Sequence, residues 1–277
     1  MGPTADGCRL REETAAASVL LAPLFEGPDR PLRVLGRAGP ALHLDTGGHT
    51  DPAVVSVTAG RGVRLPASVQ LAGPLPRSVT AARAGLGRLL LGDLRVRVHR
   101  WWRPPAPAVR DPRRAAVRAT TTAAALPPPE DAVGRALTPL RDAVRAGTGT
   151  GAARAVAVLV GLGSGLTPAG DDVLAGALVT LRAVERGGHA AAGGVASELA
   201  RAAARRSTTT LSAALLQDAG RGWCVPELAH FLAALDGRGE LRGTTPRLLA
   251  VGHSSGAALA HGAVLVLTAA EVAWGCP

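Results

Sequence analysis

The stretch Gly161-Leu-Gly-Ser-Gly-Leu-Thr-Pro-Ala-Gly-Asp-Asp-Val-Leu-Ala-Gly176 decides how the second half of the chain folds. Its three alternating glycines predict a turn with exposed backbone N–H groups, because glycine adopts positive φ at little cost. Thr167 and Pro168 then predict the N-cap and the first residue of a helix. Gly187 and Gly188 predict where that helix ends.

Two adjacent carboxylates, Asp171 and Asp172, lie in the first turn of this predicted helix. The leucines spaced i, i+4 and i+7 from Leu174 mark its buried face, so Asp171 points inward and Asp172 points toward the Gly176 side. Acids in a first turn can simply complement the helix dipole. An inward Asp beside many glycines costs stability, however, and local rules are broken in this way mainly at functional sites. We therefore expect the pair to be catalytic, with either acid as the base.

Two further stretches place hydroxyl and charged residues where predicted helices begin. Arg205-Arg206-Ser-Thr-Thr-Thr-Leu-Ser212 offers two guanidiniums and several hydroxyls to an anion, although a capping run with solvated arginines explains it equally well. Gly252-His-Ser-Ser-Gly256 is a short turn, bounded by glycines and carrying two hydroxyls, that enters the last helix. The catalytic candidates are Asp171, Asp172 and His253. The substrate-binding candidates are Gly163, Ser164, Gly165, Thr167, Arg205, Arg206, Thr209, Ser212, Ser254 and Ser255.

The glycine-rich stretch resembles the signature of the family that contains the AllH subunit of oxamate carbamoyltransferase. Thr209-Thr-Leu-Ser-Ala-Ala-Leu-Leu216 and Gly252-His-Ser-Ser-Gly256 support the resemblance, which covers roughly the second half of the chain. It implies carbamoyl transfer between carbamoyl phosphate and a small anionic amide or amine, in a complex with other subunits. Nucleotide-binding loops are disfavoured, because no lysine follows the glycines and Leu166 replaces the third glycine of a dinucleotide fingerprint.

Two other functions stay open. An Asp-activated amine could displace sulfate or phosphate within one molecule and close a ring, as a lyase or cyclase of secondary metabolism would. The chain could also be a non-catalytic structural subunit, and the apolar run 155–160 leaves open a β-strand that docks on a partner. The genes beside it would separate these functions: carbamate kinase or ureide-degradation genes favour carbamoyl transfer, whereas peptide-synthetase or sulfotransferase genes favour ring closure.

The composition narrows the class of protein. All 31 basic residues are arginine and the net charge is +10, so a Schiff-base lysine is excluded and any fixed cation in a site is Arg. The arginines are scattered and aromatic residues make up 2%, which disfavours nucleic acid and favours small anions or an acidic partner. The richness in Ala and Gly is typical of a high-GC, actinobacterial genome.

The three cysteines, Cys8, Cys224 and Cys276, are far apart and odd in number, which indicates reduced thiols and a cytoplasmic protein. No metal or other cofactor is expected. No stretch reads as a signal peptide or as a membrane span.

The patterns predict an α+β protein with a β-rich domain over 1–103, a Pro/Arg-rich linker over 104–129 and an α-helical domain over 130–277. A helix is expected at Glu12–Leu21, and the strands that follow predict a small barrel or sandwich. Those strands are Leu32–Leu35, Ala41–Leu44, Ala53–Val57, Gly62–Leu65, Val69–Leu71 and Leu94–His99. In a loop between them, His49 and Asp51 are secondary acid/base candidates.

The second domain is expected to be helical almost throughout. Its predicted helices are Glu130–Arg145, Pro168–Arg186, Gly194–Arg205, Thr209–Ala219, Pro226–Leu235 and Gly256–Ala273. Thr245-Pro246 predicts one more helix start.

Overall fold

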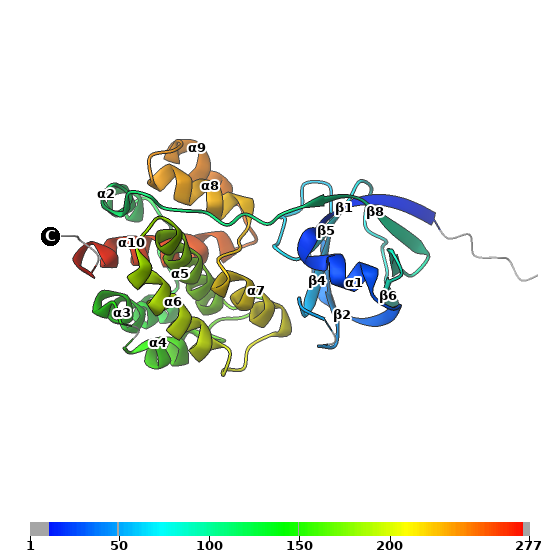
Figure 1. Cartoon of the computed structure of the whole chain (residues 1–277), viewed down its shortest axis with the longest axis horizontal. Coiled ribbons are helices and arrows are strands. Elements are labelled where there is room, and N and C mark those ends of the chain that lie inside the picture. Colours follow the sequence, from blue (N-terminus) through cyan, green and yellow to red (C-terminus); the bar gives the residue numbers. More distant parts are fainter. Residues whose placement is uncertain (1–10, 49, 149, 274–277) are drawn as a thin grey trace, which may run out of the picture. The chain divides into compact units, whose positions relative to one another are not determined.

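The chain forms two compact units, residues 1–103 and 104–277, in an α+β protein (Figure 1). A computed structural model describes residues 11–48, 50–148 and 150–273, with side chains to residue 269. The first unit is built of strands and the second of helices, so the expected α+β class is confirmed.

The first unit is a closed barrel of eight strands in the order β1-β5-β4-β3-β2-β6-β7-β8. Neighbouring strands are antiparallel except for β4 with β5 and β1 with β8, which are parallel. The strands are β1 (Arg11–Ser18), β2 (Arg30–Ala38), β3 (Ala41–Asp45), β4 (Val54–Ala59), β5 (Ser68–Leu71), β6 (Ala82–Gly85), β7 (Arg88–Leu91) and β8 (Leu94–Trp102). Of the two expected architectures, the structure is therefore the barrel.

Alternating side chains place the barrel core. In β8, Leu94 and Val96 belong to the buried hydrophobic cluster, whereas Arg95 and Arg97 face outward and pair with Glu12 of β1. This is the period-two pattern of a half-buried strand.

Parts of the first unit differ from the sequence prediction. Residues 11–18, predicted as helix, form β1, because closing the barrel pairs this segment with both β5 and β8 and buries Ala15 and Ala17. Strand β1 is followed by the 3-10 turn η1 (Val19–Leu21) and the short helix α1 (Ala22–Glu26), which has Pro23 in its first turn. The predicted strand at 62–65 is a loop, and β6 and β7 were not predicted.

The second unit is helical. Its helices are α2 (Pro112–Ala123), α3 (Asp131–Ala146), α4 (Ala152–Leu159), α5 (Ala169–Arg186), α6 (Ala190–Ala203), α7 (Thr210–Gly220), α8 (Pro226–Leu235), α9 (Leu241–Leu249) and α10 (Ser255–Ala273). The predicted long helices are present within a few residues of their expected ends.

Helix α5 is the central element of this unit: every residue from Gly170 to Leu181 is buried (Figure 1). Glycines let α10 approach it closely. A Cβ on Gly176 of α5 would collide with the backbone of Leu259, and a Cβ on Gly262 of α10 would collide with the backbone of Val173. The two helices therefore pack backbone against backbone, which fixes the relative position of their first turns.

The helical unit differs from the sequence interpretation in three details. The linker expected over 104–129 contains α2, because Asp111 caps it, Pro112 begins it and an alanine stripe buries one face. The apolar run 155–160, for which a docking β-strand stayed open, lies mostly in α4 and packs within the unit. Pro246 lies inside α9 and does not begin a helix. No helix in the described part of the chain is long and apolar enough to cross a membrane.

Candidate functional site

The glycine-rich turn is held in place by Asp171. Gly161, Gly163 and Gly165 have φ of 78°, 111° and 94°, values that favour glycine. The N–H of Gly161 donates to Asp171 Oδ1 at 2.8 Å, and the hydroxyl of Thr208 donates to Asp171 Oδ2. Both oxygens of this carboxylate, which is 1% exposed, are thus occupied. Asp171 therefore joins the turn to the segment before α7.

Asp172 differs from its neighbour because one of its oxygens is unpaired. The residue is 6% exposed, and no group in the described chain donates to its Oδ2. Burial raises the pKa of this carboxyl to about 7, and the nearby charge of Asp171 also raises it, while the hydroxyls of Ser255 and Thr167 oppose the shift. An acid with a pKa near 7 can accept or return a proton at neutral pH.

The opening of α10 lies beside Asp172. The hydroxyls of Thr167 and Ser255 are 3.2 Å apart, which joins the residues before α5 to the first residue of α10. Helix α5 starts at Ala169, with Pro168 as its N-cap. Thr167 is therefore not the cap that the sequence predicted, and its side chain faces Ser255 instead.

The turn presents unoccupied backbone donors. Gly163, Ser164 and Gly165 are exposed, and nothing in the described chain accepts a hydrogen bond from their N–H groups. The N–H groups of residues 170–172, by contrast, donate to the carbonyls of Leu162 and Pro168. Consecutive free N–H groups in a turn of positive-φ residues suit an anion.

Helix α7 forms another side of the site. Thr209 caps it by accepting from the N–H of Ser212 at 3.0 Å, and its hydroxyl donates to the carbonyl of Leu166 at 2.5 Å. Ser212 is buried. The sequence prediction included Thr209 and Ser212 and missed Thr208, although the run of three threonines contained the signal.

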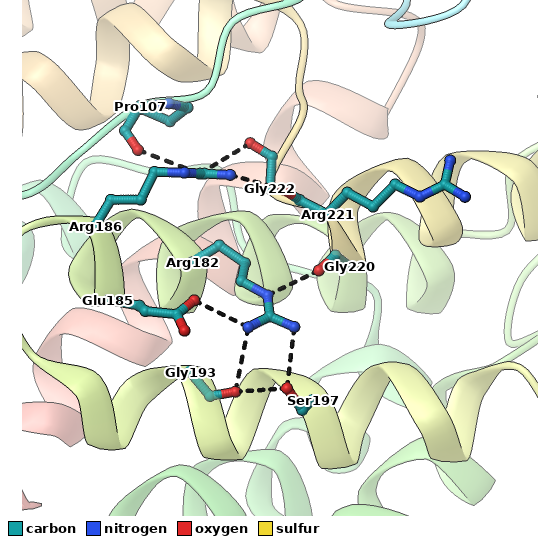
Figure 2. A network of polar contacts seen from close by, with 9 residues as sticks. All are labelled: Pro107, Arg182, Glu185, Arg186, Gly193, Ser197, Gly220, Arg221 and Gly222. Carbon is teal, nitrogen blue, oxygen red and sulfur yellow. Dashed lines mark hydrogen bonds and ion pairs between the residues drawn. The ribbon is translucent and has the colours of Figure 1, made fainter. Parts of the chain in front are cut away.

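The far end of α7 is also held by α5 (Figure 2). Arg182 donates to the carbonyl of Gly220 at 2.8 Å, and its other nitrogens bond Glu185 and two groups of α6. Arg186 donates to the carbonyls of Arg221 and Gly222 at 2.7 and 3.3 Å. The positive charges of the two arginines stabilise α7, because the C-terminal end of a helix carries a partial negative charge. Helix α5 thus fixes α7 at both ends, and with it the threonine side of the site.

Other predicted site residues are not joined to this cluster. Arg205, Arg206, His253 and Ser254 are exposed, and the structure gives their side chains no hydrogen bond or ion pair with any described residue. The segment containing both arginines still adjoins the turn, since the carbonyl of Ser207 would be 3.7 Å from a Cβ on Gly161.

The two secondary acid/base candidates belong to the first unit of the chain, whereas the cluster belongs to the second. His49 lies outside the described residues, and Asp51 is exposed in the barrel unit. Among the described residues, no three His, Cys, Asp or Glu side chains form a group that could hold a metal ion.

The residues around Asp171 and Asp172 lie in a segment that matches a known protein family. Residues 159–267 match the model of the family described as oxamate carbamoyltransferase subunit AllH. The match confirms the resemblance carried by the glycine-rich stretch and covers α5 to α9 with most of α10; we call it the AllH region. No curated protein and no solved structure matches the chain.

Proposed function

We propose that the chain is a subunit of a carbamoyltransferase-like enzyme and that its AllH region binds a small substrate with an anionic group and an amide or amine nitrogen. The family description supports a carbamoyltransferase subunit. The observation that carries the site is Asp172: a buried carboxylate with one unpaired oxygen, beside a turn with free N–H groups.

The two ends of the site have opposite preferences. The N–H groups of residues 163–165 favour an anion, with long-range help from the charges of Arg205 and Arg206. Among the described residues, Asp171 is the charged group that affects the pKa of Asp172, and its charge has the same sign. Since buried charges are normally paired, a substrate nitrogen that donates N–H to Asp172 would complete the site. The anion would therefore lie on the glycine side and the nitrogen on the aspartate side.

This arrangement suits nitrogen attack on carbamoyl phosphate. The substrate nitrogen forms a bond to the carbamoyl carbon, the bond from that carbon to the phosphate oxygen breaks, and Asp172 accepts the proton from the nitrogen. The N–H groups of the turn would stabilise the departing phosphate. Asp171 would act through the turn, by keeping these donors oriented, and would not touch the substrate.

Calorimetric titration tests the binding half of the proposal, with carbamoyl phosphate, oxamate, phosphate and sulfate as ligands. We expect binding that weakens with salt. Asp172→Asn should weaken oxamate far more than sulfate, because only oxamate offers a nitrogen to residue 172. Asp93→Asn, which changes an exposed acid between β7 and β8, is the matched control.

Co-expression with the products of neighbouring genes tests the catalytic half, by measuring carbamoyl product. Loss of product in Asp172→Asn, with the complex and the thermal midpoint retained, supports the role of the base. Full activity in that variant would move the chemistry to another subunit and leave the chain a structural subunit.

A further inference from the structure

We infer that the groove between α3 and α4 is a second binding site, for a small molecule that carries a phosphate or carboxylate group. The groove is open and has a volume of about 480 Å³, within the range of small-molecule sites. It is lined by Arg135, Thr138, Pro139, Asp142, Ala143, Ala146, Thr150, Gly151 and Arg154. None of these residues belongs to the AllH region, so this inference does not depend on the proposed function.

Two arginines make the groove suitable for an anion. Arg135 is on α3 and Arg154 is on α4, and both line the same groove. Within the described chain, neither guanidinium has an ion pair or a hydrogen bond. Two like charges that face one cavity repel each other, and an anion between them would remove the repulsion. Guanidinium groups bind phosphate and carboxylate with paired N–H donors, which adds geometric preference to the charge.

Acceptors at the same groove define the rest of the ligand. Asp142 lines it, and the structure gives its carboxylate no ion pair with either arginine or with any other described residue. Pro139 lies inside α3 and has no N–H, so the carbonyl of Arg135, four residues earlier, lacks its usual helical partner. A ligand with both an anionic group and a separate N–H or O–H group would bind the two arginines with the first and these acceptors with the second.

Small side chains provide the space. Ala143, Ala146 and Gly151 also line the groove, which follows one face of α3 at spacings of three and four residues. Helix α4 also begins here, and its N-cap, Gly151, has no side chain to accept from the first N–H groups. That feature adds to the favourable field, while the cavity and its two unpaired arginines carry the inference.

Amide NMR of the full chain during titration with inorganic phosphate and with succinate tests the site. We expect residues 150–154 to shift with both probes, and the shifts to lose at least tenfold in apparent affinity in the double variant Arg135→Ala, Arg154→Ala. The double variant Arg141→Ala, Arg145→Ala, on the same helix but outside the groove, is the matched control and should titrate like the wild type. Both pairs consist of groups with access to solvent, so the variants should fold.

The signals of residues 163–165 report the glycine-rich turn separately, so failure here and failure of the proposed function are distinguishable. Unchanged titration of residues 150–154 in the Arg135, Arg154 variant would overturn the inference. The inference would also be overturned if the signals of residues 150–154 shifted only when a partner subunit was added. The groove would then be a protein-docking surface.

Discussion

The raised pKa of Asp172 makes the stability of the protein depend on pH in a definite direction. In the unfolded chain this carboxyl ionises near 3.8, whereas in the folded protein its pKa is about 7. Between these values unfolding releases a proton, so the free energy of unfolding falls as the pH rises from about 4 to about 7. A difference of about three pKa units, at about 1.4 kcal/mol each, gives roughly 4 kcal/mol. Asp172→Asn removes this contribution, because an amide does not ionise.

Urea unfolding followed by helical circular dichroism, at a series of pH values, measures the effect. We expect the free energy of unfolding of Asp172→Asn, minus that of the wild type, to increase by a few kcal/mol between about pH 4 and about pH 8. Glu198→Gln, which changes a carboxylate in an exposed ion pair on α6, should show no such trend. A difference between Asp172→Asn and wild type that stays constant with pH would refute the argument from burial.

Three further substitutions test the framework of the site by thermal or urea unfolding. Asp171→Asn leaves a donor facing a donor, and should cost about 1–3 kcal/mol and loosen residues 161–165 in hydrogen exchange; unchanged protection there would exclude the positioning role. Gly176→Ala should destabilise the protein by about 1–3 kcal/mol, because the new Cβ would collide with the α10 backbone. Gly194→Ala, in a helix with open space around it, should stabilise it by up to about 1 kcal/mol, and equal effects of the two substitutions would contradict the close packing. Arg182→Met should cost about 2–4 kcal/mol by leaving the carbonyl of residue 220 unpaired, and a cost below that of Arg201→Met, in an exposed ion pair, would show that the clamp on α7 is weak.

The sequence predicted the placement of the acidic pair well, because helical periodicity depends only on nearby residues. The leucine spacing placed Asp171 inside and Asp172 on the Gly176 side, and in the structure α10 packs against Gly176. It could not predict which oxygens are occupied. That depends on Thr208 and Ser255, which are 37 and 83 positions away in the chain and reach the site through packing.

The errors in the fold prediction have the same origin. Residues 11–18 contain alanines and glutamates, which favour helix locally, yet they form a strand because β5 and β8 flank them in the barrel. Strands β6 and β7 are short and separated by a tight turn, so neither offers a long alternating pattern. The helices of the second unit were predictable because their buried residues repeat at helical spacing, and because glycine or proline marks several of their ends.

The parallel pairing of β1 with β8 orders events during synthesis of the chain. Strand β1 leaves the ribosome first, but one of its two neighbours in the barrel ends at Trp102. The ring cannot close until that residue has emerged, and the N-terminal segment has an unpaired edge until then. Because strands separated by long stretches of chain pair slowly, we expect this closure to limit the rate at which the barrel unit folds, and a nascent chain truncated before β8 to be sensitive to protease and prone to edge-to-edge association.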